Sequence, residues 1–203
     1  MSPSGVWALV PAKSFDRGKS RLSPALSDGA RVAFARALFD HVLGTLAASQ
    51  ALDGILVATD SPTVAEAARA LGAAVRLDPP GATTLAEVID RGLGELAERG
   101  ARTALVLMAD LPRLLPDDVR ALLAESASHP VVIARASDGV HTNALALSPP
   151  DCLATAFGRA DSFAAHLAAA RAAGLAVAVI ENPRLALDVD GPEDHARLLS
   201  RAP

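Results

Sequence analysis

The sequence contains a single cysteine, Cys152, among its 203 residues. One thiol excludes an internal disulfide bond and any metal site built from several thiolates. No apolar run approaches the roughly 20 residues that a transmembrane helix needs, so we expect no membrane association. The first residues also lack a basic region followed by a long apolar stretch. We therefore expect no signal peptide and a cytoplasmic protein.

Positive charge is also in short supply. Nineteen basic residues face 23 acidic ones, which gives a net charge of −4. A dedicated nucleic-acid binder usually carries a broad basic face, so the charge balance argues against nucleic acid as a partner. The hydrophobic fraction of 51% is enough for a substantial core. The length predicts one domain, which we place over residues 1–203.

Several catalytic signatures are missing as well. The sequence has no H-E-x-x-H zinc motif, no G-x-S-x-G nucleophile motif and no G-x-x-x-x-G-K-S/T phosphate loop. Their absence gives no support for a zinc protease, a serine hydrolase of the α/β type or a P-loop nucleotidase. The chemistry has to be sought in less regular constellations.

Apolar strand candidates alternate with helical patterns along the chain. Strands are predicted at about 5–11, 54–59, 73–77, 103–109, 130–135, 142–147 and 175–180. Helices are predicted at 28–47, between Ser61 and Gly72, after Thr84, from Pro116, near 161–173 and near 192–201. This order predicts an α/β three-layer sandwich of the Rossmann-like kind, with a mostly parallel sheet. The short connection at 136–141 favours a small antiparallel insertion.

A cationic loop follows the first predicted strand, which ends at Pro11. Lys13, Arg17, Lys19 and Arg21 fall within nine residues of this loop. Open α/β proteins bind phosphorylated ligands at the carboxyl ends of their strands. Lysine supplies a compact charge for phosphate, and arginine supplies a planar fork. The loop therefore predicts a phosphate site, although a solvated surface loop has the same composition.

Three aspartates stand where strands are expected to end. Asp110 comes directly after a buried apolar strand, where a carboxylate can hold Mg²⁺ together with phosphate oxygens. The alternative for Asp110 is a turn before Pro112. Asp188 and Asp190 project to the same side of an extended segment, which is costly without a cation or hydrogen-bond donors. The alternative for Asp190 is an N-cap of the last helix, with Glu193 three residues on.

Polar residues near two later elements are candidates for substrate contact. Thr142 and Asn143 offer neutral donors, and His141 precedes them as a ligand contact, a pH-sensitive group or an exposed side chain. Ser162 is expected at a helix N-terminus, where free N–H groups bind anions, or as part of a simple cap. His166 follows one turn later and is expected to serve packing or the surface.

The order of these segments resembles one family over nearly the whole chain. The shared pattern is V-P-x-K-x-x-x-x-x-K-S-R-L, x-D-L-P, T-N-A-L, F-G…S-F-x-x-H and L-D-V-D-x-P-E-D. Taken jointly, these motifs are similar to those of the CofC/FbiD guanylyltransferases of coenzyme F-420 biosynthesis. The wider resemblance is to MobA-like nucleotidyltransferases with a GT-A-type fold.

The resemblance implies a reaction in which GMP passes from GTP to a small phosphorylated carboxylic acid, with release of pyrophosphate. The acceptors that it implies are phosphoenolpyruvate, 2-phospho-L-lactate or 3-phosphoglycerate, and the product would pass to a downstream transferase. It also implies a role for each motif residue. Mg²⁺ would be held by Asp110, Asp188 and Asp190. Nucleotide phosphates would be held by Lys13, Lys19 and Arg21, with Lys13 and Asp110 catalytic. The phospho-acid would be held by Thr142, Gly158 and Ser162, while His141 and Asn143 are substrate-binding candidates from their own side chains.

Three positions depart from the family pattern. His141 stands where glycine is usual, the segment from Phe157 to Ser162 is one residue longer, and the usual G-L-N appears as Thr83-Thr84-Leu85. Guanine preference therefore comes from the family and not from these residues. Two other functions stay open. A MobA-like or sugar-phosphate nucleotidyltransferase is disfavoured because the G-G-x-S-x-R-x-G-x-D-K loop is absent. A non-catalytic nucleotide-binding protein is disfavoured because the three aspartates are retained.

Overall fold

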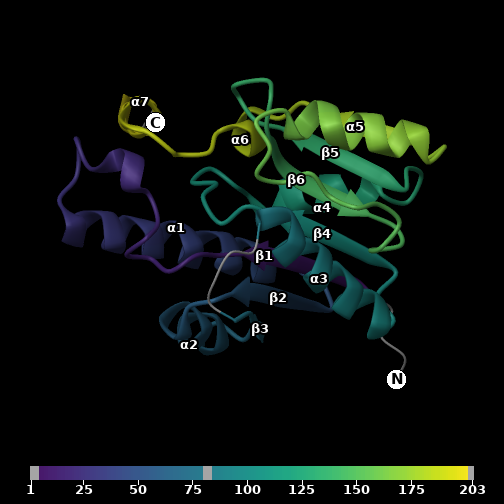
Figure 1. The fold of residues 1–203 in the computed structure, drawn as a ribbon, viewed down its shortest axis with the longest axis horizontal. Helices are drawn as coiled ribbons and strands as arrows, with labels where there is room; N and C mark the ends of the chain where they lie inside the picture. Colours follow the sequence, from purple (N-terminus) through teal and green to yellow (C-terminus); the bar gives the residue numbers. More distant parts are fainter. Residues whose placement is uncertain (1–4, 80–83, 201–203) are drawn as a thin grey trace.

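A computed structural model of the protein describes residues 5–79 and 84–200. Its centre is a seven-stranded sheet in the order β3-β2-β1-β4-β6-β5-β7 (Figure 1). The strands follow the apolar runs of the sequence; the five inner strands are largely buried, and the edge strands β3 and β7 are partly exposed. They are β1 (Val6–Pro11), β2 (Gly54–Thr59), β3 (Ala74–Leu77), β4 (Thr103–Leu107), β5 (Val131–Arg135), β6 (Thr142–Leu147) and β7 (Val177–Ile180).

One strand runs against all the others. β6 pairs antiparallel with both β4 and β5, whereas the remaining pairs in the sheet are parallel. The turn at 136–141 is closed by a hydrogen bond from Ala136 N–H to the His141 carbonyl. The predicted antiparallel insertion is therefore confirmed, and it consists of β6 lying between β4 and β5. As a result, the first residues of β6 lie at the same edge of the sheet as the carboxyl ends of β1 and β4.

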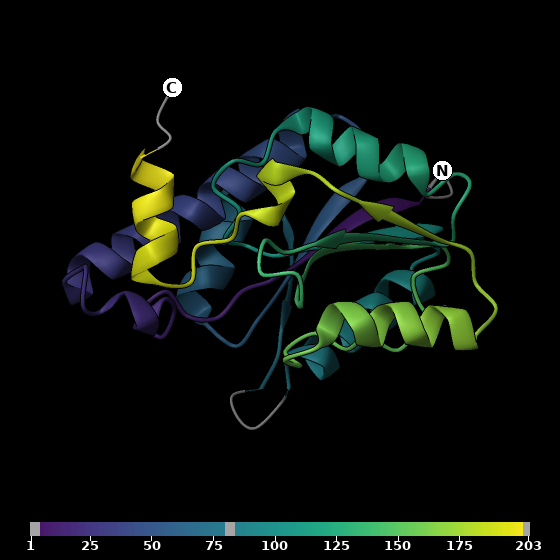
Figure 2. The same cartoon turned by 90° about the horizontal axis from the view of Figure 1, so that it is seen from above.

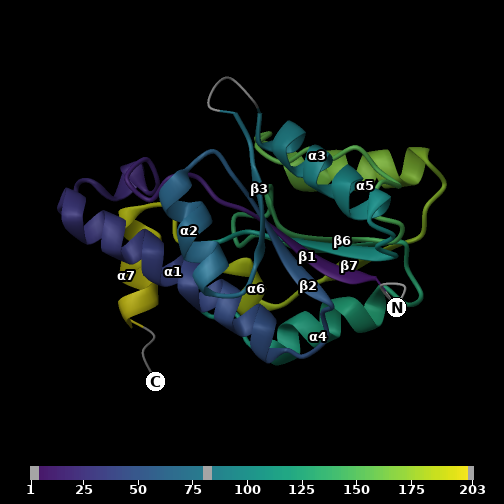
Figure 3. The same cartoon turned by 90° about the horizontal axis from the view of Figure 1, so that it is seen from below.

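Helices cover both faces of the sheet (Figures 2 and 3). Buried apolar side chains divide between the two faces, and this division gives the three layers that the sequence predicts. One face carries α1 (Asp28–Ala48), α2 (Pro62–Ala70), α4 (Pro116–Glu125) and α6 (Pro183–Ala186). The opposite face carries α3 (Leu85–Glu98) and α5 (Ser162–Ala172).

The last helix lies away from the sheet. α7 (Pro192–Ser200) stands beside the first half of α1, where the His195 ring packs edge-on against Phe34 with 5.3 Å between centroids (Figure 2). The cationic loop, which includes the short 3₁₀ helix η1 (Ser20–Leu22), lies next to it. The cationic loop near the N-terminus and the segment before α7 near the C-terminus therefore lie on the same side of the molecule.

The predicted strands and long helices are confirmed, and their caps follow the sequence signals. The Ser61 hydroxyl accepts from Val64 N–H, and Thr84 and Glu87 form a reciprocal capping box. The sequence patterns did not predict η1 or α6. Thr83, which belongs to a segment compared with the family pattern, lies outside the described residues. Within the described ranges, no helix has the length and apolar character required to cross a membrane.

Candidate active site

The predicted site residues gather around one cavity of about 1120 Å³. It opens where β1 and β4 end and β6 begins, which is the usual ligand edge of an open α/β sheet. Every residue predicted to bind substrate, nucleotide or metal borders it: Lys13, Lys19, Arg21, Asp110, His141, Thr142, Asn143, Gly158, Ser162, Asp188 and Asp190. Segments separated by up to 177 positions in the sequence therefore meet at one edge, as the resemblance implied.

Lys19 is the central cation of the site. Its backbone has a φ of +55°, an uncommon conformation for a residue with a side chain. Its side chain is only 11% exposed, and Nζ lies 2.6 Å from Asp110 Oδ2 and 3.1 Å from Asp190 Oδ1. Burial alone would lower the pKa of Lys19, but the two carboxylates outweigh it and raise that pKa. Lys19 is therefore a fully charged ammonium held between two aspartates.

The other cations of the loop are more exposed. Arg17 forms two 2.8 Å hydrogen bonds with the carboxylate of Asp60, which follows β2. The Arg21 guanidinium is 3.8 Å from Asp190. Lys13 is exposed at the cavity rim and makes no ion pair with another described residue. The loop thus combines one buried lysine with three side chains that reach solvent.

Asp110 and Asp188 form a carboxylate pair that the protein neutralises incompletely. Asp110 Oδ1 is buried and has no hydrogen-bond partner among the described residues. Asp188 receives one hydrogen bond, at 3.2 Å, from the Asn143 amide. Burial, together with the nearby charge of Asp110, raises the pKa of Asp188 to about 6. These properties fit a divalent cation, which would balance both charges and supply Asp110 Oδ1 with a partner.

The three aspartates predicted to bind Mg²⁺ do not form a metal-binding cluster in this structure. In the described part of the chain, no three acidic, histidine or cysteine side chains come close enough to hold a metal ion. The Lys19 ammonium lies between Asp110 and Asp190 and contacts both. The assignment of Asp110, Asp188 and Asp190 to Mg²⁺ therefore stays a prediction.

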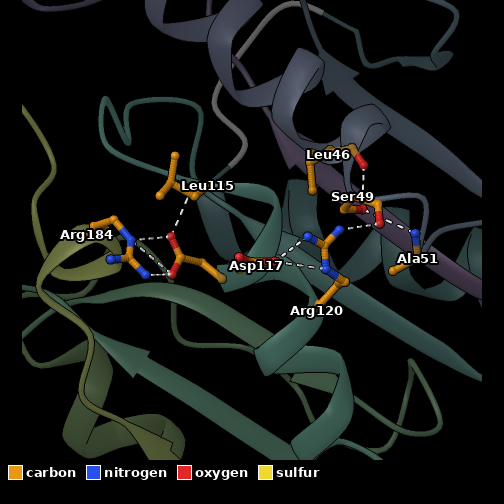
Figure 4. A network of polar contacts seen from close by, with 8 residues as sticks. Leu46, Ser49, Ala51, Leu115, Asp117, Arg120 and Arg184 are labelled. Atoms are coloured by element: carbon orange, nitrogen blue, oxygen red, sulfur yellow. Dashed lines mark hydrogen bonds and ion pairs between the residues drawn. The ribbon is translucent and has the colours of Figure 1, made fainter.

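The segment that carries Asp188 and Asp190 is tied to the fold from two sides. Asn143, 3% exposed in β6, donates its amide hydrogens to the carbonyl oxygens of Leu185 and Ala186 as well as to Asp188. On the other side, Arg184 binds the buried carboxylate of Asp118 through three contacts of 2.6–3.1 Å (Figure 4). The Asn143 amide is thus already used within the protein.

The N-cap alternative for Asp190 is not what the structure contains. Asp194, not Asp190, caps this turn, because its Oδ2 accepts from the backbone N–H groups of Asp190 and Gly191. The carboxylate of Asp190 faces Lys19 instead. Glu193 takes no part in either contact.

The far side of the cavity is lined by neutral donors. Thr142 and Ser162 are buried, and Thr142 N–H donates to Ser162 Oγ at 3.1 Å. Gly158 has a φ of +85°, and a Cβ there would lie 3.3 Å from the Leu85 side chain. His141 is exposed and bonded to Asp138 through Nδ1. Burial would raise the pKa of Asp138, but hydrogen bonds from His141 and from nearby backbone N–H groups outweigh burial and lower that pKa.

Sequence reasoning missed three residues of this region. Asp60 follows β2 as Asp110 follows β4, so the same signal could have found it. Asp138 lies three residues before His141 and holds its ring. His166 is fully buried and packs against Phe157, which is one of the two roles expected of it, but the hydrogen bonds at both of its ring nitrogens were not predicted. Its spacing of four residues from Ser162 places both on one face of α5.

Comparisons with known sequences identify the family of this chain. The family described as "Guanylyl transferase CofC like" matches residues 6–201. A phosphoenolpyruvate guanylyltransferase from Sphaerobacter thermophilus is 37% identical over 97% of this chain and 93% of its own. A 2-phospho-L-lactate guanylyltransferase from Methanothermobacter thermautotrophicus is 33% identical over 95% and 83%. A 3-phospho-D-glycerate guanylyltransferase from Phenylobacterium zucineum is 37% identical over 92% and 86%.

Solved structures support the fold. A nucleotidyl transferase from Methanothermobacter superposes with a TM-score of 0.69 at 16% identity, covering 96% of this chain and 95% of its own. The protein Rv0371c of Mycobacterium tuberculosis, crystallised in complex with manganese, gives a TM-score of 0.59 at 18% identity, with 98% and 99% covered. The match over residues 6–201 and the identities of 33–37% establish the lineage. This chain belongs to the CofC-like family of guanylyltransferases.

Proposed function

We propose that this enzyme transfers GMP from GTP to the phosphate group of a three-carbon phospho-acid and releases pyrophosphate, as a step of coenzyme F-420 biosynthesis. One observation carries the proposal. A single cavity, large enough for a nucleotide and a small acid, holds a cationic loop on one side and under-neutralised carboxylates next to it. Two polyanions can react only where such charges offset their mutual repulsion.

The cationic loop would bind the triphosphate of GTP. Lys13 and Arg21 are exposed at the cavity rim, so their charges are available to an incoming polyanion. Lys19 is already committed to Asp110 and Asp190, and it would exchange these partners for phosphate oxygens when the nucleotide binds. In this assignment Lys13 and Asp110, which both line the cavity, would be the catalytic residues and would act at the α-phosphate.

A divalent cation, which we take to be Mg²⁺, would be held by Asp110, Asp188 and Asp190. When bound, it supplies positive charge to the triphosphate and to the leaving pyrophosphate. Asn143 borders the cavity, and its amide would orient Asp188 on this side of the site. The Lys19 contacts keep Asp110 and Asp190 neutralised until nucleotide and cation arrive.

The acceptor would lie against Thr142, Gly158 and Ser162. Its phosphate oxygen attacks the α-phosphorus of GTP, and the bond from that phosphorus to the β-phosphate oxygen breaks. The attacking oxygen is already ionised, so the reaction needs neither a strong general base nor a covalent enzyme intermediate. Positioning of the two substrates supplies much of the remaining barrier reduction.

Phosphoenolpyruvate is the acceptor that we propose first, with 2-phospho-L-lactate and 3-phosphoglycerate as alternatives. The support for this choice is the naming of relatives at 37–40% identity as phosphoenolpyruvate guanylyltransferases. His141, where the family pattern has glycine, borders the cavity and is the residue most able to alter this choice. The product is an activated diphosphate, which a downstream transferase would consume.

The test is a matrix of four nucleoside triphosphates against the three phospho-acids, with Mg²⁺ or Mn²⁺, in which pyrophosphate is measured and the product is weighed by mass spectrometry. We expect release with GTP and one of the three acids, together with a product whose mass equals the acid plus a guanylyl group. Release with CTP instead would support a cytidylyltransferase. No release in any combination would contradict the proposal and favour a non-catalytic nucleotide-binding protein.

A further inference from the structure

A buried histidine stands behind the acceptor side of the cavity. His166 is 0% exposed and lies on α5, one turn after Ser162. Its ring packs edge-on against Phe157, with 4.8 Å between centroids. His166 does not border the cavity, but Thr142, which it contacts, does. His166 therefore reaches the cavity only through neighbours that line it, Thr142 by a hydrogen bond and Phe157 by ring packing.

Two hydrogen bonds fix the proton on this ring. The backbone N–H of Ala156 donates to His166 Nε2 at 2.8 Å, so Nε2 carries no proton. The proton of the neutral ring must then sit on Nδ1, which lies 3.0 Å from Thr142 Oγ1. Burial lowers the pKa of His166 to about 4, so the ring is neutral at physiological pH. His166 therefore donates to Thr142, and the Thr142 oxygen accepts.

This direction of donation leaves two hydroxyl hydrogens without protein acceptors. Because Thr142 Oγ1 accepts from His166, the hydroxyl hydrogen of Thr142 must point elsewhere. Ser162 Oγ accepts from Thr142 N–H, so its hydrogen is directed elsewhere too. Within residues 5–79 and 84–200, neither hydroxyl donates to a protein group. Both residues border the cavity, where an anionic oxygen of a ligand would be able to receive these hydrogens.

We propose that His166 is a positioning residue that fixes Thr142 as a hydrogen-bond donor, so that Thr142 and Ser162 form a two-hydroxyl receptor for an anionic oxygen of the phospho-acid. This inference rests on the proposed function. The receptor offers hydrogen-bond donors without positive charge, so it binds the acid without competing for the triphosphate. His166 thereby acts on the acceptor and not on GTP.

The experiment compares three variants of His166 with the wild type. His166→Gln can still accept from Ala156 N–H but loses the donor to Thr142. His166→Asn retains a donor near the position of Nδ1, and His166→Phe retains neither function. We expect the KM for the phospho-acid to rise about tenfold to hundredfold in the Gln and Phe variants and less in the Asn variant. The KM for GTP should stay within about twofold.

A double-mutant cycle and a control separate positioning from simple destabilisation. In a Thr142→Val background, replacement of His166 should raise the KM for the acid no further, because the hydroxyl that His166 orients is gone. Ala170→Gly, at a buried position of the same helix, should lower the Tm without changing the KM for the acid. Additive effects in the cycle, or equal changes in both KM values, would overturn the proposal.

Nitrogen-15 NMR of the histidine rings tests the proton position without any turnover. We expect the His166 signals of the wild type at pH 7 to show a protonated Nδ1 and an unprotonated Nε2. A protonated Nε2 would overturn the proposal whatever the enzyme does. Conversely, an enzyme that transfers GMP normally while His166→Gln leaves the KM for the acid unchanged refutes the role of His166 and leaves the proposed function standing.

Discussion

Asp118, which lies in α4, and Asp188, which follows α6, differ in how their buried carboxylates are compensated. Asp118, 1% exposed, accepts hydrogen bonds from Arg184, from the Asn182 amide and from Leu115 N–H. Burial alone would raise the pKa of Asp118, but these hydrogen bonds together outweigh burial and lower that pKa. Asp188 accepts a hydrogen bond of 3.2 Å from the Asn143 amide, and burial beside Asp110 raises its pKa to about 6.

The two carboxylates differ in their hydrogen-bond partners, and this difference predicts a structural role for Asp118 and a functional role for Asp188. Asp118 has the partners that a buried carboxylate needs, so it stabilises the fold by tying α6 to α4 (Figure 4). Asp188 lacks such partners, which supports the proposal that it holds a cation. Removing Asp118 should therefore harm stability, and removing Asp188 should harm activity.

The largest expected effect is that of Asp188→Asn on turnover. We predict a loss of GMP transfer of at least about 10³-fold, because the cation and the triphosphate lose a charged ligand. The Tm should be no lower than that of the wild type, since the substitution relieves repulsion with Asp110. Kinetics and thermal unfolding on the same preparation check both parts. A variant that is both active and unstable would reverse the comparison.

Asp118→Asn should show the opposite pattern. Loss of the ion pair with Arg184 should lower the free energy of unfolding by about 2–3 kcal/mol at pH 7. The folded-state pKa of Asp118 lies below its ordinary value of 3.8. Its stabilisation is therefore complete above that pH and is lost as pH falls through the lower folded-state value. Denaturation at several pH values should show the difference from wild type shrinking in acid. A difference in unfolding free energy that stays constant with pH would mean that the charge of Asp118 does not contribute to stability.

Gly158→Ala tests the acceptor side of the site with a smaller effect. The φ of +85° and the approach to Leu85 should cost about 1–2 kcal/mol of stability. Because the glycine borders the cavity, we also expect a higher KM for the phospho-acid and an unchanged KM for GTP. Steady-state kinetics with each substrate varied in turn would check this. A change in the KM for GTP alone would place Gly158 on the nucleotide side of the cavity.

Arg17→Ala should have the smallest effect. The guanidinium is 60% exposed and its partner Asp60 is 23% exposed, so the pair contributes less than about 1 kcal/mol. We expect kcat/KM to change less than about fivefold. A larger loss in the same assay would add Arg17 to the residues that bind the triphosphate.

Much of the fold could be predicted because its signals are local. Continuous apolar runs, the Ser61 and Thr84 caps and the short 136–141 connection each specify an element by nearby residues alone. The short helices η1 and α6 were not predicted. α6 is held by contacts with residues distant in the sequence, such as that of Arg184 with Asp118 of α4, that no local pattern contains.

The site was predicted through residue types at strand ends and through resemblance to the family. What the sequence could not specify is the pairing of these residues. The contact of Lys19 with Asp110 spans 91 positions, and that of Asn143 with Asp188 spans 45. His166 was missed for a related reason. A histidine on a helix has no local signal that distinguishes a hydrogen-bonded ring from one that only packs.

The most direct test of the account is pyrophosphate release by the wild type, Asp188→Asn and Asp118→Asn, measured side by side with GTP, phosphoenolpyruvate and Mg²⁺ at a temperature where all three are folded. The account predicts full release by the wild type, release within about fivefold of it by Asp118→Asn, and none detectable by Asp188→Asn. Wild-type release by Asp188→Asn would contradict the claim that the under-neutralised carboxylates form the reaction centre.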